Sequence, residues 1–312
     1  MRDAFVQTLD AIAAQDPRVL LMTGDLGFGV LTDFAERRPA QYINVGVAEQ
    51  NLSGLAAGLA MSGQTVFTYS IGNFPTLRCL EQIRNDICYH DAPVKIVAIG
   101  GGFSYGSLGM SHHATEDIAI MRALPRMTVF VPGDLDEAVM ATQAAYDAPG
   151  PCYLRLDKSS APKTAGSESQ IIAGQPRKLR DGSDVVMFGA GGILEEALAA
   201  AESLAADGVS CAVYSVHTIK PLDGSMVARL AAQARVVVTV EEHTLDGGLG
   251  SVLLECCAGE GVWPRRLLRF GMRDEYSSIV GSQRFLRRHY GLSAEALANG
   301  VRAALAEKTN TD

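Results

Sequence analysis

The sequence predicts an α/β protein made of two three-layer domains with mostly parallel sheets. Short apolar runs rich in Val, Ile and Phe alternate with segments of helical periodicity, which is typical of parallel sheets covered on both faces. The length of 312 residues suits two domains. A polar stretch rich in Ser, Gly, Ala and Pro interrupts the alternation over residues 159–180 and is typical of an interdomain linker.

Residues 1–158 are expected to form the first domain. Its apolar runs predict strands, and the amphipathic segments between them predict helices. The strands are expected at Val19–Thr23, Tyr42–Val45, Thr65–Tyr69, Val94–Ile99, Thr128–Val131 and Cys152–Leu156. The helices are expected at about Asp3–Ala14, Glu49–Met61, Pro75–Tyr89, Thr115–Leu124 and Leu135–Tyr146.

Residues 181–312 are expected to form a smaller second domain in which the same alternation resumes. Its strands are expected near Asp184–Phe188, Ser210–Tyr214, Val236–Val240 and Leu267–Phe270. Its helices are expected near Leu194–Ala206, Gly224–Ala234, Gly247–Ala258 and Ser293–Glu307. No internal repeat is evident beyond the shared α/β rhythm.

Composition and charge exclude several classes of protein. A hydrophobic content of 47% with 20% charged residues excludes a mainly disordered chain, and a formal charge of −8 argues against a nucleic-acid-binding protein. The basic residues Arg177, Lys178 and Arg180 are interpreted as solvated surface. No secretory signal and no run of about 18 apolar residues is found, and the six cysteines form no regular framework. A cytoplasmic protein without a membrane partner is therefore expected.

The glycine-rich segment Gly189–Leu194 follows a predicted strand and invites comparison with a dinucleotide-binding turn. It lacks the third glycine, since Leu194 stands there, and the next strand ends without an acidic residue. A tight strand-to-helix turn explains it better. A Walker-type loop and zinc-ligand spacing are also missing, so no metal site is expected in this chain.

Glu49 is the most informative single residue, because its neighbours Val45, Val47, Leu52 and Leu55 are apolar. An ionised carboxylate in such surroundings needs a partner. It could cap the N-terminus of the helix that begins there. It could also lie in a dry pocket and share a proton with a ligand nitrogen. The segment by itself leaves both interpretations open.

A second candidate is the loop over residues 100–111, which holds five glycines and leads into His112 and His113. Such a loop lets the backbone approach a ligand closely, and a histidine at its end can move protons near neutral pH. A surface loop with two solvated histidines is the alternative.

Taken together, several motifs in the same order resemble the C-terminal subunit of a split transketolase. They are NVGVAEQN at 44–51, FPTLRCLEQIRND at 74–86, GMSHHATEDIAIMRALP at 109–125, VHTIKPLD at 216–223 and EEHTLDGGLG at 241–250. The resemblance implies a pyrimidine-binding domain over 1–158 and a transketolase C-terminal domain over 181–312. It also implies transfer of a two-carbon ketol unit from a ketose to an aldose, with thiamine diphosphate and Mg²⁺.

The resemblance assigns cofactor contacts to five residues. Glu49 matches the glutamate that hydrogen-bonds the aminopyrimidine N1′ and promotes the ring tautomer needed for catalysis. Phe74 matches the residue that stacks on this ring, and Leu26 matches a residue near the thiazolium. Leu77 and Leu80 match positions that are often aromatic in the family. For the four apolar residues, core packing is the alternative.

The resemblance assigns substrate contacts to a second group. His112 matches a catalytic histidine that contacts the substrate oxygen, and His113 stands where a glutamine is common. Arg2 and Lys158 match arginines that hold a sugar phosphate, and Arg78 follows closely behind the stacking position. Arginine and lysine can both pair with phosphate, although lysine does so as a point charge.

Two departures from the family pattern bear on the substrate. Leu108 replaces an aspartate that selects hydroxylated substrates, and Gly100 falls where a phosphate-contacting histidine is expected. We therefore expect a modified, deoxy or differently charged sugar rather than a standard pentose phosphate alone. The sequence does not name the donor, the acceptor or the pathway.

The chain has no Gly-Asp-Gly turn followed by an asparagine, which is the family's site for the diphosphate and Mg²⁺. A second polypeptide, an N-terminal subunit, is expected to supply it in a complex with two copies of each chain. A deoxyxylulose phosphate synthase-like protein and the beta subunit of a 2-oxo acid dehydrogenase remain alternatives. A non-catalytic scaffold subunit is a third.

Overall fold

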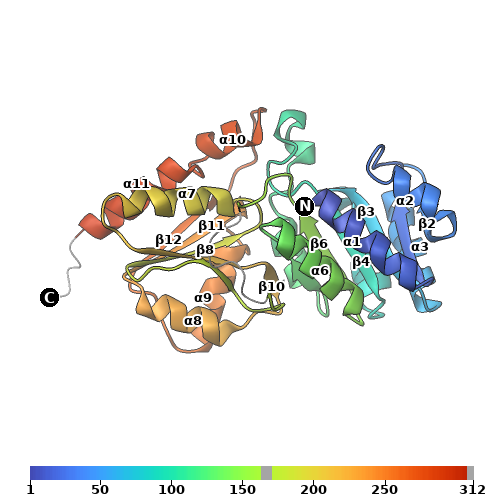
Figure 1. Cartoon of the computed structure of the whole chain (residues 1–312), viewed down its shortest axis with the longest axis horizontal. Coiled ribbons are helices and arrows are strands. Elements are labelled where there is room, and N and C mark those ends of the chain that lie inside the picture. The colour runs from blue at the N-terminus through green and yellow to red at the C-terminus, as the bar shows by residue number, and fades with distance from the viewer. Residues whose placement is uncertain (163–170, 308–312) are drawn as a thin grey trace.

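The computed structural model of the protein describes residues 1–162 and 171–307. Two α/β domains lie side by side along the long axis of the molecule, and the N-terminus lies near their junction (Figure 1). Each domain has one mostly parallel sheet with helices on both faces. The predicted fold class is therefore confirmed.

The first sheet combines six strands of the first domain with one short strand from the second. In chain order the strands are β1 (Val19–Thr23), β2 (Tyr42–Asn44), β3 (Thr65–Ile71), β4 (Val94–Ile99), β5 (Thr128–Phe130), β6 (Cys152–Leu156) and β10 (Thr218–Lys220). Within the described residues the spatial order is β10-β5-β6-β4-β3-β1-β2. Every pairing is parallel except that of β10 with β5.

The helical segments of the first domain are α1 (Arg2–Gln15), α2 (Thr32–Arg37), α3 (Glu49–Met61), α4 (Leu80–Gln82), α5 (Asp117–Ala123) and α6 (Leu135–Asp147). A π-helical turn over Ile83–Cys88 continues α4, and short 3-10 turns lie at Pro39–Gln41, Leu77–Cys79, Gly106–Leu108 and Met110–His112.

The first sheet is buried on both faces because successive strand residues point to opposite sides. In β1, Leu21 packs with α1 and α6, whereas Met22 packs with α3 and the π-helical turn. Ala56 and Ala57 on α3 are small enough for the helix to lie close to the sheet. This packing holds the start of α3 at the carboxyl end of β2.

The second sheet consists of β7 (Arg177–Arg180), β8 (Val185–Ala190), β9 (Cys211–Ser215), β11 (Val236–Thr244) and β12 (Leu267–Met272). Its order is β12-β11-β8-β9-β7, with only the β7–β9 pairing antiparallel among the described strands. The helices are α7 (Leu194–Ala205), α8 (Gly224–Gln233), α9 (Leu249–Gly259), α10 (Gln283–His289) and α11 (Ala294–Ala306). Helices α7 and α11 cover one face, and α8 and α9 cover the other (Figure 1).

The stretch predicted as a linker is only partly described, and its last four residues are structured. Residues 163–170 lie outside the described part of the chain. Arg177–Arg180 form β7, in which Arg177 points inward and Lys178 outward. Arg177 is 4% exposed and forms ion pairs with Asp134 and Glu137 at 2.8 and 3.1 Å, so its interpretation as solvated surface was wrong. The inward face of an edge strand explains this.

One buried ionic network joins the two domains. The Arg155 guanidinium on β6 lies 3.1 Å from an Asp117 carboxylate oxygen and donates to the Glu242 backbone carbonyl at 3.0 Å. Asp157 accepts from the Gly192 backbone amide at 2.7 Å. The Glu242 carboxylate is in turn paired with Arg287. Because these groups are buried, each depends on its partners for compensation.

None of the helices in the described part of the chain is both long enough and apolar enough to cross a lipid bilayer.

Candidate functional site

The residues that the sequence singles out follow the carboxyl ends of neighbouring strands in the first sheet. Leu26 follows β1, Glu49 follows β2, Phe74 follows β3, His112 follows β4 and Lys158 follows β6. Parallel strands present their carboxyl ends at one edge of a sheet, and this edge is where open α/β sheets bind ligands. Topology alone therefore brings these segments together.

Glu49 is the first residue of α3, and its side chain is 4% exposed. The helix has Ala48 at its N-cap, without a side-chain cap. Instead, the Glu49 carboxylate accepts a hydrogen bond from the Arg78 guanidinium at 2.8 Å. Gly24 lets the loop after β1 approach, because an added Cβ would lie 3.7 Å from the Glu49 Cγ. The carboxylate is thus held in a pocket and does not cap the helix.

Three side chains gather around Glu49 and form with it what we call the Glu49 cluster: Glu49, Phe74, Arg78 and His112. The Arg78 Cζ lies 4.5 Å from the centre of the Phe74 ring. The Phe74 and His112 rings are 5.2 Å apart and meet edge to face at 69°. Asn73 fixes the histidine loop beside β3 by donating to the His113 carbonyl at 2.7 Å. The cluster combines a buried carboxylate, an aromatic face and an imidazole.

The expected grouping of Arg78 with the phosphate-binding residues is not what the structure shows. Arg78 lies in the 3-10 turn Leu77–Cys79, directly after Phe74, and this turn directs its side chain towards the start of α3. Its guanidinium contacts Glu49 and Phe74. Proximity to Phe74 along the chain was a correct signal, but it indicated a contact with the ring.

His113 was expected near the substrate, but it points into the interior. It is 3% exposed, and its Nε2 lies 3.2 Å from the Gly106 carbonyl oxygen. Its ring meets the edge of Phe103, with 5.2 Å between ring centres. The backbone becomes extended at His113, which turns its side chain away from that of His112. Only the first histidine of the pair joins the Glu49 cluster.

The three leucines of the expected cofactor site have different surroundings. Leu26 lines a cavity of about 300 Å³ beside α2, together with Phe28 and Leu31. Leu77 is 42% exposed next to Arg78, whereas Leu80 is partly buried and packs against the core. Leu80 thus serves core packing in this structure, and Leu26 and Leu77 present apolar surface.

Arg2 and Lys158 do come together, since both line a cavity of about 220 Å³ at the junction of the domains. The Lys158 ammonium lies 3.7 Å from the centre of the Tyr105 ring. Two cations at the mouth of one cavity suit an anionic group. The sequence did not single out Tyr105, although its place within the five-glycine loop could have suggested a ligand-facing side chain.

Gly100 has no room for a side chain, which explains its departure from the family pattern. Its φ is +89°, and an added Cβ would lie 2.2 Å from the Tyr105 ring. The Tyr105 ring therefore fills the space that a side chain at residue 100 would need. Leu108, the other departure, is 53% exposed in the same loop.

We expect Gly100→Ala to lower the free energy of unfolding by about 2–4 kcal/mol, because left-handed backbone strain adds to overpacking against Tyr105. Gly63→Ala is the matched control, since Gly63 has a φ of +96° with nothing within 4 Å of an added Cβ. It should cost only about 1 kcal/mol from backbone strain. Urea unfolding of both variants measures the difference, and equal losses would contradict the role given to Tyr105.

The most strongly shifted pKa values belong to buried groups away from the Glu49 cluster. Burial, followed by the nearby Asp134, raises the pKa of Glu137 to about 7. Burial likewise raises that of Glu241 to about 7, although this carboxylate accepts from backbone amides at the start of α9. Burial lowers the pKa of His243 to about 4. These groups support packing and the domain junction, so a perturbed pKa is not by itself the mark of the site here.

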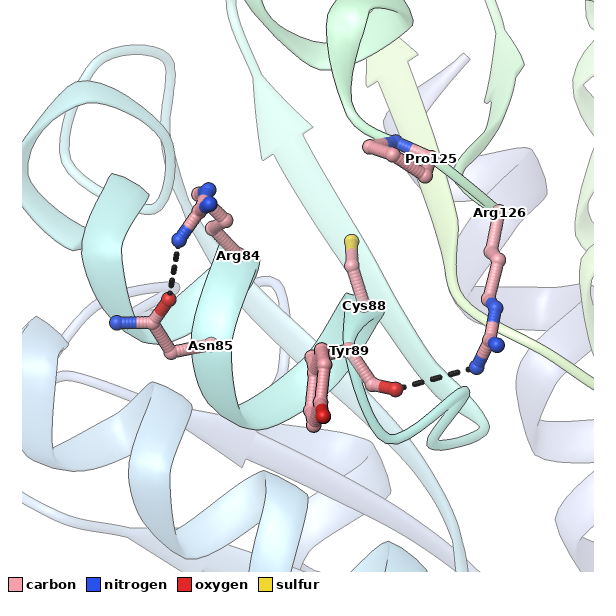
Figure 2. A pocket seen from close by; sticks show the side chains of 6 residues that line it. All are labelled: Arg84, Asn85, Cys88, Tyr89, Pro125 and Arg126. Atoms are coloured by element: carbon pink, nitrogen blue, oxygen red, sulfur yellow. Dashed lines mark hydrogen bonds between the residues drawn. The ribbon is translucent and has the colours of Figure 1, made fainter.

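A further cavity of about 250 Å³ lies on the first domain and includes none of the expected site residues (Figure 2). Figure 2 shows Arg84 bonded to Asn85 at one rim and Arg126 donating to the Tyr89 carbonyl at the other. Burial raises the pKa of Cys88 to about 11, so its thiol is protonated and weakly nucleophilic. This cavity offers no group suited to catalysis.

Among the described residues, no group of three or more His, Cys, Asp or Glu side chains could hold a metal ion. The Glu49 cluster itself suits one face of a nitrogen-containing aromatic ring. Its buried carboxylate can hydrogen-bond a ring nitrogen, and the Phe74 face can stack on the ring.

Two family models match the chain. The model described as "Transketolase, pyrimidine binding domain" matches residues 1–164, and "Transketolase, C-terminal domain" matches residues 174–297. One of the two subunits of the apulose-4-phosphate transketolase of Phocaeicola vulgatus is 34% identical over 298 residues, covering 95% of this chain and 94% of that protein. The 6-deoxy-6-sulfo-D-fructose transketolase subunit SqwH of a Clostridium species is 36% identical over 305 residues, covering 97% and 93%.

Among solved structures, one titled "Split gene transketolase, inactive beta4 tetramer" has a TM-score of 0.88 and 35% identity. The match covers 99% of both chains. The similarity therefore extends over both domains and through their junction.

Proposed function

The chain belongs to the transketolase family, and we propose that it is the C-terminal subunit of a two-chain transketolase that moves a two-carbon ketol unit from a ketose to an aldose. The observation that carries this proposal is the Glu49 cluster. It places a 4% exposed carboxylate beside an aromatic face at the carboxyl edge of a parallel sheet. Family membership says which ring such a pocket would receive.

We propose that Glu49 and Phe74 hold the aminopyrimidine of thiamine diphosphate, with Leu26 and Leu77 as apolar surroundings. When bound, this cofactor supplies the carbanion chemistry that makes and breaks carbon–carbon bonds. Glu49 would hydrogen-bond the ring nitrogen and hold its proton, and Phe74 would fix the plane of the ring. His112, whose ring meets Phe74, would bind the substrate oxygen.

The diphosphate and Mg²⁺ would be held by a partner chain. The sequence lacks the Gly-Asp-Gly and asparagine motif, and the described residues offer no cluster of metal-ligating side chains. Relatives that match over nearly their full length are themselves named as subunits. We therefore propose a complex of two N-terminal and two C-terminal subunits, with the cofactor between unlike chains.

The cavity lined by Arg2 and Lys158 supports an anionic sugar as substrate. One relative is named for a sugar phosphate and another for a sulfonated sugar, so the anionic group differs between relatives. We propose a modified, negatively charged ketose as donor, because Leu108 and Gly100 remove polar contacts that a standard pentose phosphate would use. Tyr105, which covers Gly100 and carries Lys158, would shape this end of the site.

The test is to reconstitute the chain with a partner that carries the Gly-Asp-Gly and asparagine motif and to assay a panel of ketose donors. Turnover is expected only with both chains, thiamine diphosphate and Mg²⁺. Turnover by the isolated chain would contradict the two-chain proposal. Carbon dioxide release from pyruvate would favour a deoxyxylulose phosphate synthase-like or 2-oxo acid dehydrogenase subunit. A stable complex that binds no cofactor would favour a scaffold subunit.

A further inference from the structure

One guanidinium in the Glu49 cluster makes both of the contacts that a bound pyrimidine ring would use. Arg78 donates to the Glu49 carboxylate at 2.8 Å, and its Cζ lies 4.5 Å from the centre of the Phe74 ring. A guanidinium is planar and carries its donors at its edge, so it can stack on a ring and hydrogen-bond a carboxylate simultaneously. An aminopyrimidine has the same two properties.

We propose that Arg78 is a resident substitute for the cofactor ring, held between Glu49 and Phe74 until thiamine diphosphate displaces it. This inference rests on the proposed function, because it assigns the same pocket to the cofactor. It goes further by giving Arg78 a role that opposes cofactor binding. Arg78 is then a positioning residue that sets how tightly the complex holds its cofactor.

The exposure of the two partners supports such an exchange. The Arg78 side chain is 47% exposed and lies in a short 3-10 turn, whereas that of Glu49 is 4% exposed at the start of a buried helix. Arg78 can move into solvent without disturbing the core, and Glu49 cannot. A partly exposed ion pair is also weak enough to be replaced by a ligand.

Arg78 also explains how a buried carboxylate is tolerated before the cofactor arrives. Without a donor, the Glu49 carboxylate would be left in an apolar pocket, which is unfavourable for a charge. The guanidinium compensates that charge. Removing Arg78 should therefore destabilise the chain by itself and favour the cofactor complex.

The experiment measures binding of thiamine diphosphate by calorimetry to the reconstituted two-chain complex. Arg78→Met keeps the length of the side chain and removes its donors and charge. Its dissociation constant for thiamine diphosphate should fall about 3- to 10-fold, as the loss of a partly exposed ion pair and a cation–π contact implies. The melting temperature of the isolated variant chain should fall by about 2–4 °C.

Arg84→Met is the matched control, because Arg84 lies six residues further along the same segment, is exposed and has a guanidinium that bonds to the side chain of its neighbour Asn85. It should leave both measurements unchanged. Arg78→Lys keeps the charge but loses the planar stack, and its dissociation constant should lie between those of wild type and Arg78→Met. Should Arg78→Met not fold, Arg78→Lys still decides the direction of the effect.

The outcomes separate this inference from the proposed function. If the wild-type complex binds thiamine diphosphate and Arg78→Met binds it no more tightly, the resident-substitute role is wrong and the proposed function stands. Weaker binding by Arg78→Met would show that the guanidinium holds the cofactor directly. If the wild-type complex binds no thiamine diphosphate, the proposed function itself fails.

Discussion

Replacing Glu49 by Gln is expected to lower the turnover of the reconstituted complex by about 10²–10⁴-fold, the usual contribution of a positioned acid or base. Gln keeps the size and a hydrogen-bonding oxygen but cannot take up or release the proton that a ring nitrogen requires. Since Glu49 is buried and its carboxylate faces Arg78, the substitution also removes the charge that Arg78 compensates. The rate of ketose consumption at saturating cofactor measures the effect.

Glu81→Gln is the control for this experiment. Glu81 lies in α4, close behind Arg78, but its side chain is exposed. The same chemical change there should leave turnover at the wild-type value. Circular dichroism and assembly with the partner chain must be unchanged for both variants, so that lost activity is not lost structure. Near-normal turnover of Glu49→Gln would exclude the catalytic role of this residue.

Replacing Arg155 by Met is expected to lower the free energy of unfolding by about 3–5 kcal/mol, because it leaves buried charges without their partner. Arg155 is 1% exposed, and its Nε lies 3.1 Å from Asp117 and 4.0 Å from Asp157. The same guanidinium donates to the backbone carbonyls of Ala114 and Glu242 at 3.0 Å. Methionine fills most of the volume but satisfies none of these groups. Urea unfolding followed by circular dichroism gives the loss.

Two further variants make this prediction specific. Arg235 pairs with Asp184 at 3.6 Å on the surface, with its side chain 60% exposed, so Arg235→Met should cost less than about 1 kcal/mol. Adding Asp117→Asn to Arg155→Met removes one of the stranded charges. The double variant should therefore lose less than the sum of the two single losses. Strict additivity would mean that the pair does not interact.

Strands and helices with a strong local signal were predictable from the sequence. Strands β4 and β6 and helix α3 begin and end at the predicted residues, because continuous apolar runs and small-residue periodicity mark them clearly. Elements whose formation depends on a distant partner were missed. β7 is a polar segment that pairs with β9, and β10 is three residues long and pairs with β5. Their local sequences carry little strand signal.

The expected helix over Pro75–Tyr89 shows a similar limit within the site. The segment instead forms a 3-10 turn, a short α-helical stretch and a π-helical turn. Motifs placed Phe74 and Arg78 near each other, but only this local geometry decides that the guanidinium lies over the ring and reaches Glu49. The orientation of His113 likewise depends on the Phe103 packing that no motif reports. Position along the chain was readable, and side-chain direction was not.

Strand β10 has a consequence for how this protein can be taken apart or recombined. It comes from the second half of the chain but completes the first sheet beside β5, and the His217 carbonyl accepts from the Val131 amide at 2.8 Å. Lys220 adds bonds from its ammonium to the Leu124 and Arg122 carbonyls at 2.6 and 3.0 Å. A gene cut between the two family-model domains would leave the edge of β5 open to aggregation. The natural unit for domain exchange or gene fusion is therefore the pair of domains, and neither half is a self-contained module.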